Sequence, residues 1–231
     1  MGVAAIVFDF DGVVLDSEEP DFLAWQEIWL ERGQDLPLEE WAACIGTGQG
    51  QHSFDPFAEL VRRSGLDMDE PEVRERKRAR AAELTVARPP LAGVVAWLEE
   101  ATEAGLALAV ATSSPRDWVE THLARLGLAG YFSALACFDD CGAKKPDPAS
   151  YLLACRQLGV APPAALAVED SSNGLLAAKA AGLRCVVVPN VMTAHMDFSS
   201  ADLVLGSLEE AGPLEVIERL SQAPSRSEAV G

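Results

Sequence analysis

The chain has 231 residues, of which 49% are hydrophobic and 23% are charged, the proportions of an ordinary soluble globular protein. Its 18 Lys and Arg residues stand against 36 Asp and Glu residues, which gives a formal net charge of −18. A field of this sign repels nucleic acids and anionic membranes, so we expect no partner of either class.

The amino-terminal segment does not follow the pattern of a secretory leader, and no run approaches the roughly 18 apolar residues that suggest a membrane span. The cysteines are odd in number and widely scattered, and no second Cys/His pair stands at zinc-site spacing. We therefore expect a cytoplasmic protein whose cysteines are in the reduced thiol state and serve only in packing. For the oligomeric state we take a monomer as the default.

Short apolar runs alternate with helical patterns along most of the chain. The predicted strands are residues 3–8, 106–111, 134–137, 165–168, 185–188 and 203–205. The predicted helices between them include residues 94–104, 116–126, 148–158 and 175–181, and a glycine follows each of these helices closely. Strands that are apolar throughout and alternate with helices predict an α/β protein, with a Rossmann-like, doubly wound parallel sheet covered by helices on both faces.

One segment interrupts this alternation. Residues 18–85 contain helical patterns only, among them Trp25, Ile28 and Trp29 at helical spacing and a helix start at Asp69 with Pro71 close behind. We therefore expect a helical module inserted into the α/β domain. The predicted organisation is a core of residues 1–17 and 86–220, a helical insertion of residues 18–85, and a flexible tail of residues 221–231.

Polar and charged residues stand where four of the predicted strands end. In chain order they are Asp9 and Asp11, Thr112 and Ser113, Lys145, and Glu169 with Asp170. Taken singly, an aspartate after a strand is most often a cap or turn former, and a lysine in a Pro-containing loop is usually only solvated. In an open parallel sheet, however, the carboxyl ends of the strands lie along one edge, where ligands bind. We therefore expect these residues to form one site.

The chemistry of this set is that of phosphoryl transfer. Asp9 and Asp11 are two residues apart, and with Glu169 and Asp170 they would form an acidic cluster. Such a cluster is unfavourable without a compensating cation, and ligands that are all oxygen favour Mg²⁺. Hydroxyl and backbone N–H groups after the second strand, together with a lysine ammonium, suit phosphate oxygens.

The motifs resemble those of the haloacid dehalogenase superfamily of phosphotransferases. The stretch DFDGVVLDS is similar to the family's first motif, ATSS to its second, KKPDP to its third and VEDSSNG to its acidic fourth. The insertion between the first two motifs resembles the family's α-helical cap. Because these parts span nearly the whole chain in the right order, the resemblance implies the family's core fold, its phosphatase chemistry and its magnesium ion.

The resemblance also implies roles. Asp9 would be the nucleophile that forms an aspartyl-phosphate, and Asp11 would protonate the leaving alcohol and then activate water. Thr112, Ser113 and Lys145 would bind the phosphoryl group. The implied metal ligands are Asp9, the backbone carbonyl of Asp11, and Asp170, with Glu169 binding either the ion or its ligands. Asp11 itself argues for phosphate chemistry, since dehalogenase members lack an acid at that position.

Within the family, the chain most resembles the sugar-phosphatase and β-phosphoglucomutase branch. Asp21 stands where mutases carry a histidine, and the predicted cap loop offers Gly46 and Gln49 to a substrate but no cation. Hydrolysis of a small phosphorylated metabolite, such as a sugar phosphate, is therefore the preferred prediction. A phosphosugar mutase and a catalytically silent binding protein of the same fold are the alternatives.

Two further features of the insertion stay open at this point. The glycine-rich loop around Gly46 is either a substrate-facing loop or a plain turn between helices. The basic run either turns one cation toward the substrate or forms a solvated helix face. This run consists of Arg74, Arg76, Lys77, Arg78 and Arg80.

Overall fold

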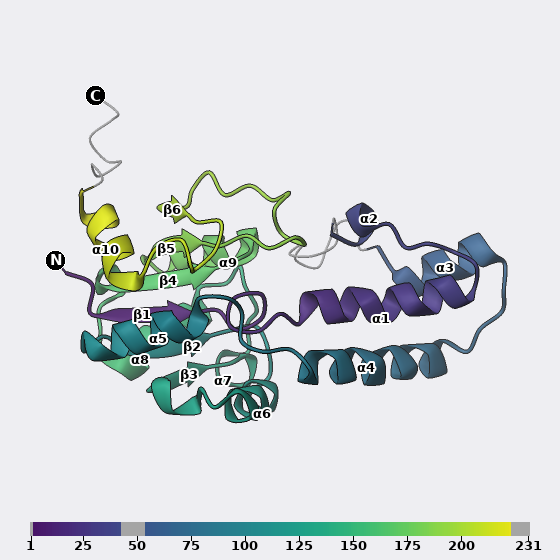
Figure 1. Cartoon of the computed structure of the whole chain (residues 1–231), viewed down its shortest axis with the longest axis horizontal. Coiled ribbons are helices and arrows are strands. Elements are labelled where there is room, and N and C mark those ends of the chain that lie inside the picture. Colours follow the sequence, from purple (N-terminus) through teal and green to yellow (C-terminus); the bar gives the residue numbers. More distant parts are fainter. Residues whose placement is uncertain (1, 43–53, 223–231) are drawn as a thin grey trace.

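The structure is a computed structural model that describes residues 2–42 and 54–222. Figure 1 shows an α/β core and an elongated bundle of helices, which extends from the edge of the core toward which the strands point. We call residues 18–42 and 54–86 the helical arm. The chain passes from the core into this arm directly after the first strand and returns before the second.

The core contains a six-stranded parallel sheet in the order β3-β2-β1-β4-β5-β6. The strands are β1 (Ala5–Phe8), β2 (Ala107–Ala111), β3 (Ala134–Ala136), β4 (Ala165–Glu169), β5 (Arg184–Val187) and β6 (Leu203–Val204). The order reverses at β1, and the register places Phe8 beside Val110 of β2 and Val168 of β4. The predicted doubly wound parallel sheet is thus confirmed.

Alternation along the strands gives the sheet two different faces. On one face, Ile6, Phe8 and Val110 belong to a core of large apolar side chains under α5, α6 and α10. On the other face, Val7 is surrounded by alanines of the neighbouring strands, such as Ala109, where α8 and α9 pack. Small side chains let a helix approach a sheet closely, so the alanine-rich strands reflect helix packing on that face.

Helices cover the sheet as the alternation predicts. They are α5 (Val94–Glu103), α6 (Arg116–Leu126), α7 (Phe138–Cys141), α8 (Ala149–Leu158), α9 (Ser172–Ala180) and α10 (Pro213–Gln222), with 3-10 turns at Ala129–Tyr131 and Pro162–Ala164. Gly127 and Gly159 end α6 and α8 with left-handed φ values of 72° and 68°. Helix α9 begins three residues earlier than expected because the Ser171 hydroxyl caps it by accepting from Gly174 N.

The helical arm consists of α1 (Glu18–Glu31), α2 (Leu38–Ala42), α3 (Pro56–Ser64) and α4 (Glu70–Val86). Figure 1 shows α1 and α4 side by side over most of their length. The arm has its own apolar cluster, which includes Trp25, Trp29 and Leu60. At the start of α4 the Asp69 carboxylate accepts from Glu72 N, which is the predicted helix cap.

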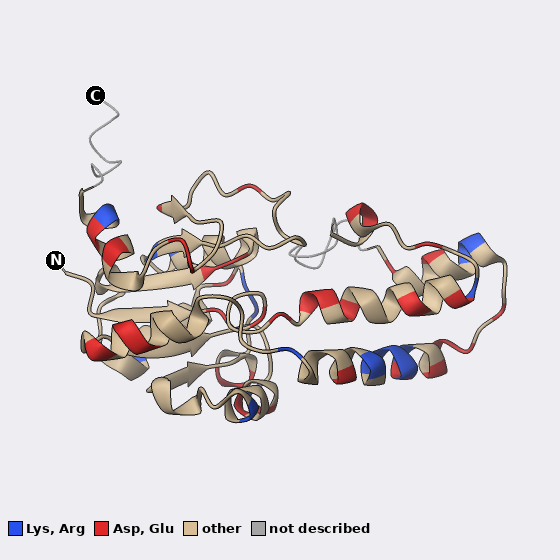
Figure 2. Cartoon of the chain, viewed as in Figure 1, with Lys and Arg blue, Asp and Glu red and all other residues tan. Residues whose placement is uncertain are grey.

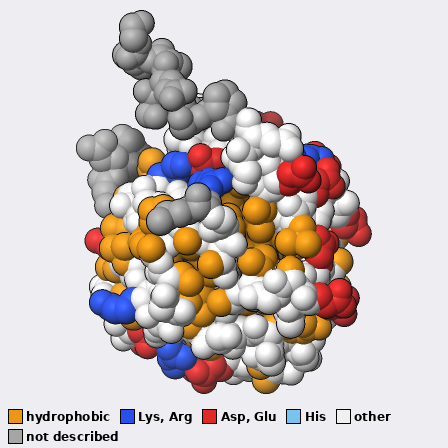
Figure 3. All heavy atoms as spheres, turned by 90° about the vertical axis from the view of Figure 1, so that its left-hand side faces the viewer, with side chains coloured by type: hydrophobic (Ala, Val, Ile, Leu, Met, Phe, Trp, Pro, Cys, Tyr) orange, Lys and Arg blue, Asp and Glu red, His pale blue; other side chains and the backbone are white. Residues whose placement is uncertain are grey.

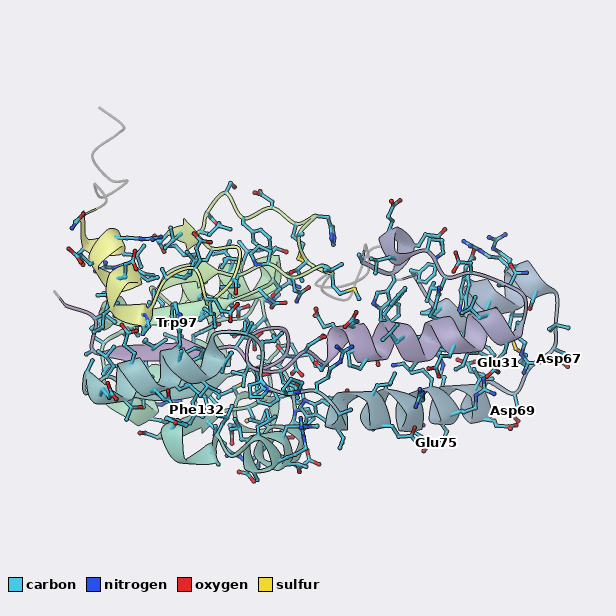
Figure 4. All side chains as sticks on the ribbon, in the orientation of Figure 1. Glu31, Asp67, Asp69, Glu75, Trp97 and Phe132 are labelled. Atoms are coloured by element: carbon cyan, nitrogen blue, oxygen red, sulfur yellow. The ribbon has the colours of Figure 1, made fainter. Side chains whose placement is uncertain are left out.

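Ion pairs line the seam between α1 and α4. Figure 2 shows basic residues along α4 and acidic residues along the neighbouring α1. Glu31 and Glu75 lie toward the end of the arm distant from the sheet (Figure 4). Every residue of the predicted basic run is paired with an acid. The pairs are Arg74 with Asp55 and Glu70, Arg76 with Glu31, Lys77 with Asp21, Arg78 with Glu75, and Arg80 with Glu27 and Glu83.

The opposite end of the core has a different character. Figure 3 views this end, and hydrophobic side chains gather in its centre with acidic groups along one rim.

Helix α10 ends at Gln222, so the first two residues of the predicted tail are helical and residues 223–231 lie outside the described part. Within residues 2–42 and 54–222, no helix combines the length and apolarity needed to cross a membrane.

Candidate active site

Three carboxylates converge at the edge of the sheet from which the helical arm extends. Asp9 directly follows β1, while Glu169 ends β4 and Asp170 follows it, and β1 and β4 are neighbours in the sheet. Each of the three offers an oxygen atom within 4.8 Å of the others. Their exposures are 8%, 0% and 1%, so the cluster is almost completely removed from solvent.

Burial makes these charges unstable on their own. It raises the pKa of Asp9 to about 8, because desolvation and the neighbouring Glu169 outweigh the opposing attraction of Lys145. Burial and the charges of Glu18 and Asp9 raise the pKa of Asp170 well above its ordinary value. Without further positive charge Asp9 would therefore retain its proton near neutral pH.

The cluster fits a divalent cation. At a metal–oxygen distance of roughly 2.1 Å, two ligands of a Mg²⁺ ion lie at most about 4.2 Å apart. The oxygens of the three acids lie within 4.8 Å of one another, so small side-chain adjustments would bring them to one ion. The donors are all carboxylates, the ligand type that hard cations such as Mg²⁺ prefer. A bound cation would also remove the electrostatic cost of ionising Asp9 and Asp170 together. The residues present therefore fit a metal of this class.

Lys145 lies against the same cluster from the loop that precedes α8. Its Nζ is 2.7 Å from Asp9 Oδ1 and 2.6 Å from Glu169 Oε1, and its side chain is only 6% exposed. Burial favours the neutral amine, but the two carboxylates outweigh it and raise the pKa of Lys145 above its ordinary value. The Tyr151 hydroxyl donates to the same oxygen of Glu169. Lys145 is thus a buried cation beside Asp9.

Two glycines make room for the acids. Gly12 has a φ of +82°, and a Cβ there would lie 2.2 Å from Asp170 Oδ2. At Gly174 a Cβ would lie 1.9 Å from Glu169 Oε2. Both are far below any tolerated contact, so the glycines of DGVV and SSNG are required by the packing of the carboxylates themselves.

The side chain of Asp11 does not join the cluster of three. Its Oδ1 accepts from Ser17 Oγ at 2.6 Å and from Trp118 Nε1 at 3.1 Å, while Oδ2 accepts from Ser114 Oγ. The predicted ligation of a metal by the backbone carbonyl of Asp11 stays a prediction. What the structure adds is a set of donors around an acid that must transfer a proton in the predicted chemistry.

Thr112 and Ser113 follow β2 as expected, but not every predicted phosphate donor is available. Thr112 N donates to Ala136 O in the sheet, so this N–H is already used and the prediction for it is wrong. The Thr112 hydroxyl accepts from Ser114 N, which leaves its own proton for another acceptor. Ser113 Oγ accepts from Lys145 N at 3.1 Å and so helps to hold the lysine loop.

Several contacting residues were not found from the sequence. Asn190, after β5, donates through Nδ2 to Asp170 Oδ2 at 2.8 Å and to Glu18 Oε2 at 3.3 Å. Its Oδ1 accepts from Met192 N and Thr193 N, which fixes the amide orientation. The position of Asn190 at another strand end was an available signal. Trp118 and Tyr151 lie within helices, where nothing in the sequence distinguishes them from core residues.

The predicted substrate contacts Gly46 and Gln49 lie outside the described residues. A cavity of about 490 Å³ borders Gly12 and Asn190, and its other walls come from the connections between core and arm and from the loops after β5 and β6. It contains neither Thr112 nor Lys145 in its lining. It is therefore not the place where these residues would hold a phosphate.

Comparison with known proteins places this geometry in a family. Residues 3–182 match the family described as haloacid dehalogenase-like hydrolases. The chain belongs to this family. The haloacid dehalogenase-like match covers the strand ends that deliver Asp9, Thr112, Lys145 and Asp170.

Its relatives in this family include proteins named as phosphatases. The chain is 40% identical over 208 residues to a putative phosphatase, YhcW, of Bacillus subtilis, which covers 90% of this chain and 93% of that protein. It is 35% identical to hexitol phosphatase B of Escherichia coli, over 90% of this chain and 94% of that one. With the hydrolase family shown, the chain is an enzyme of the phosphatase class.

A solved structure agrees with the same assignment. The crystal structure of CbbY from Rhodobacter sphaeroides in complex with phosphate superposes with a TM-score of 0.73 and 34% identity, covering 94% of this chain and 99% of that one. The fold of this haloacid dehalogenase-like hydrolase is therefore shared with a protein that was crystallised with phosphate.

Proposed function

We propose that the chain is a Mg²⁺-dependent phosphatase that hydrolyses a small phosphate monoester through an aspartyl-phosphate on Asp9. One observation carries this proposal: the Lys145 ammonium lies 2.7 Å from the Asp9 carboxylate beside two further buried acids. A nucleophilic carboxylate, a fixed cation and an acidic metal site are the parts that phosphoryl transfer needs at one point.

In this proposal Asp9 and Asp170 hold the metal, with Glu169 and the backbone carbonyl of Asp11 completing the set of protein ligands. Bound Mg²⁺ would supply positive charge to the phosphate oxygens and offset their repulsion from the acids. Glu169 also accepts from Lys145 and Tyr151, so it orients the lysine whether or not it contacts the ion.

The remaining steps belong to the chain's own side chains. An Asp9 oxygen attacks phosphorus while Lys145 and the Thr112 hydroxyl bind the phosphoryl oxygens. Asp11 gives a proton to the leaving alcohol as its P–O bond breaks. Asp11 then takes a proton from water, which attacks the aspartyl-phosphate and releases phosphate and free Asp9.

The helical arm is proposed to act as a cap over this site, with residues 18–85 as its extent. The support is its position: α1 begins directly after Ser17, whose hydroxyl donates to Asp11, and Glu18 accepts from Asn190 beside Asp170. Glu18 therefore lies where the cap and the metal site meet, and burial raises its pKa to about 7. The cap would then select the substrate.

For the substrate we propose a phosphorylated sugar or polyol. A related protein of 35% identity is named hexitol phosphatase B, and the CbbY structure holds a phosphate ion. The mutase alternative has less support, because Asp21, at the position where mutases carry a histidine, is a carboxylate paired with Lys77. The silent-protein alternative has less support, because Asp9, Asp11, Lys145 and Asp170 are all present and the relatives of the chain are named as phosphatases.

The proposal is tested by a screen of sugar and polyol phosphates with and without Mg²⁺, followed by the Asp9→Asn variant. We expect Mg²⁺-dependent release of phosphate by the wild type and none above background by the variant. Asp197→Asn is the matched control, because it makes the same chemical change at an exposed acid outside the cluster, where an amide oxygen can keep the hydrogen bond from Ser199 N. Undiminished turnover by Asp9→Asn would refute the nucleophile assignment.

A further inference from the structure

One face of α6 forms a continuous set of contacts between the candidate active site and the end of the helical arm. Trp118, His122 and Arg125 stand four and three residues apart, a spacing that places them on the same side of a helix. Figure 1 shows α6 on the side of the core next to the end of α4. The sequence motifs gave none of these residues a role.

At the active-site end, Trp118 Nε1 donates to Asp11 Oδ1 at 3.1 Å. The other partners of this carboxylate are the hydroxyls of Ser17 and Ser114. A serine hydroxyl can rotate, and it can either donate or accept a hydrogen bond, whereas an indole N–H can only donate. Trp118 is therefore the one of these three partners whose direction and donor character are fixed by its own chemistry.

The Trp118 indole packs against the ring of His122. The two ring centroids are 4.2 Å apart and the interplanar angle is 63°. His122 is buried, and burial together with Arg125 lowers its pKa, so its Nδ1 is free to accept from Arg125 Nε at 3.3 Å. Arg125 also donates to Arg88 O at 2.9 Å and Thr85 O at 3.4 Å, where the chain leaves α4.

We propose that Trp118 is a positioning residue that sets the orientation of the Asp11 carboxylate for proton transfer. The inference rests on the proposed function, in which Asp11 serves as acid and then as base. Because the indole can only donate, Oδ1 is kept as an acceptor and Oδ2 is the oxygen that carries the proton. The Ser114 hydroxyl contacts Oδ2. It accepts a hydrogen bond from Oδ2 when Oδ2 is protonated, and it donates one to Oδ2 when Oδ2 is not.

In the first step the Oδ2–H bond breaks as the leaving oxygen takes the proton, and the electron pair stays on Oδ2. The P–O bond breaks at the same time, and its electron pair goes to the leaving oxygen. A leaving group that is stable as an anion needs no such proton, whereas an alkoxide does. Loss of the positioning contact must therefore affect alkyl phosphates and spare activated aryl phosphates.

The test compares Trp118→Phe with the wild type on two substrates, 4-nitrophenyl phosphate and an alkyl phosphate that the wild type hydrolyses. Since kcat/KM reports the steps up to cleavage of the ester, we expect a loss of about tenfold for the alkyl substrate and less than about twofold for the aryl one. Equal losses on both substrates, or no loss on either, would overturn the inference.

Two reference variants separate the possible failures. Asp11→Asn should shift the alkyl-to-aryl ratio further in the same direction; an unchanged ratio there would refute the proposed role of Asp11 itself. Trp97→Phe is the matched control, because the Trp97 indole N–H bonds to Leu208 O and Ala211 O in the core. We expect it to leave the ratio unchanged.

A second measurement avoids the Phe variant. In an NMR spectrum of the ¹⁵N-labelled protein, the indole N–H signal of Trp118 should shift and exchange faster with solvent in Asp11→Ala, while that of Trp97 stays in place. An unmoved Trp118 signal in a folded Asp11→Ala protein would show that the hydrogen bond does not form, and the inference would be wrong.

Discussion

The carboxyl edge of the sheet and the helical arm both contain many acids, and they balance them differently. At the sheet edge, Lys145 is 6% exposed and shared between two buried carboxylates. In the arm, Arg80 and Glu27 form a close pair with both side chains more than 40% exposed. Solvent screens the second kind of pair, so it contributes little to stability, while the first kind cannot be altered without leaving a buried charge.

This difference distinguishes a charged residue that takes part in the chemistry from charged residues that form solvated ion pairs. From the sequence, the five cations of α4 could either turn one charge toward the substrate or form a solvated helix face, and in the structure each is engaged by an acid of the arm. A lysine in a KKPDP loop would by itself be expected to be only solvated, yet Lys145 is buried beside Asp9. Burial, rather than the number of charges, indicates where the chemistry lies.

The largest effect should come from the buried cation. We expect Lys145→Gln to lower kcat by a factor on the order of 10³, because it removes a fixed positive charge from the transferring phosphate. Lys144→Gln is the matched control; that neighbouring lysine is exposed and lies over the Phe138 ring. Steady-state kinetics of both variants would decide, and similar losses in the two would remove the distinction between buried and exposed cations.

The glycine next to Glu169 should matter for folding. A Cβ at Gly174 would lie 1.9 Å from a fully buried carboxylate, so Gly174→Ala should lower the free energy of unfolding by about 1–3 kcal/mol. Gly130→Ala is the control, because a Cβ there meets nothing within 4 Å. Urea unfolding measures both. A Gly174→Ala protein as stable as the wild type would mean that Glu169 is not held as tightly as described.

Asn190 should act on metal affinity more than on the fold. It orients Asp170 through a 2.8 Å hydrogen bond, and loss of such an outer contact typically weakens metal binding by about 10–100-fold. We therefore expect Asn190→Ala to bind Mg²⁺ less tightly in isothermal titration calorimetry. Asn173→Ala, at the start of α9, serves as a comparison variant that carries the same side-chain truncation. Unchanged affinity in Asn190→Ala would contradict the role assigned to that hydrogen bond.

The pH dependence of stability follows from the raised pKa of Asp9. Burial lifts this pKa from an ordinary value near 3.8 to about 8, so between these values the folded, metal-free protein binds more protons than the unfolded chain. Its contribution to stability is therefore present in acid and falls as the pH rises toward 8. Because Mg²⁺ favours ionised Asp9, the increase in Tm that Mg²⁺ causes should be larger at pH 8 than at pH 6. Thermal unfolding would show an equal increase at both values if the site were not coupled to the metal.

The smallest effect belongs to the arm. Arg80→Gln removes a pair with Glu27 that is exposed on both sides, so we expect no resolvable change in Tm or in kcat/KM. At high salt the wild type and the variant should likewise have the same Tm. A clear loss of activity in Arg80→Gln would place a functional group in the arm that the ion-pair pattern does not indicate.

The sequence predicted the sheet and the convergence of Asp9, Lys145, Glu169 and Asp170 for one physical reason. Parallel strands bring their carboxyl ends to the same edge, so residues far apart in the chain can be placed together from strand order alone. Strand ends were predicted to within one or two residues because glycines and polar residues bound the apolar runs.

What the sequence could not predict depends on the direction of side chains within helices. Trp118 and Tyr151 stand in α6 and α8 at positions that also suit core packing, and only the tertiary arrangement shows that their polar atoms reach Asp11 and Glu169. The use of Thr112 N in the sheet was hidden for a different reason, since it depends on where β3 ends relative to β2.

The central claim is that Asp9 is the group that receives the phosphoryl group, and it can be tested by chemical trapping. The enzyme would be mixed with Mg²⁺ and a substrate that it hydrolyses, and the reaction would be quenched during turnover. The protein would then be reduced with borohydride and digested for mass spectrometry. Reduction of an aspartyl-phosphate yields homoserine, so we predict this residue at position 9 in the wild type only when substrate is present. Homoserine at a different aspartate, or none at position 9 under conditions where a known aspartyl-phosphate enzyme is trapped, would contradict the account.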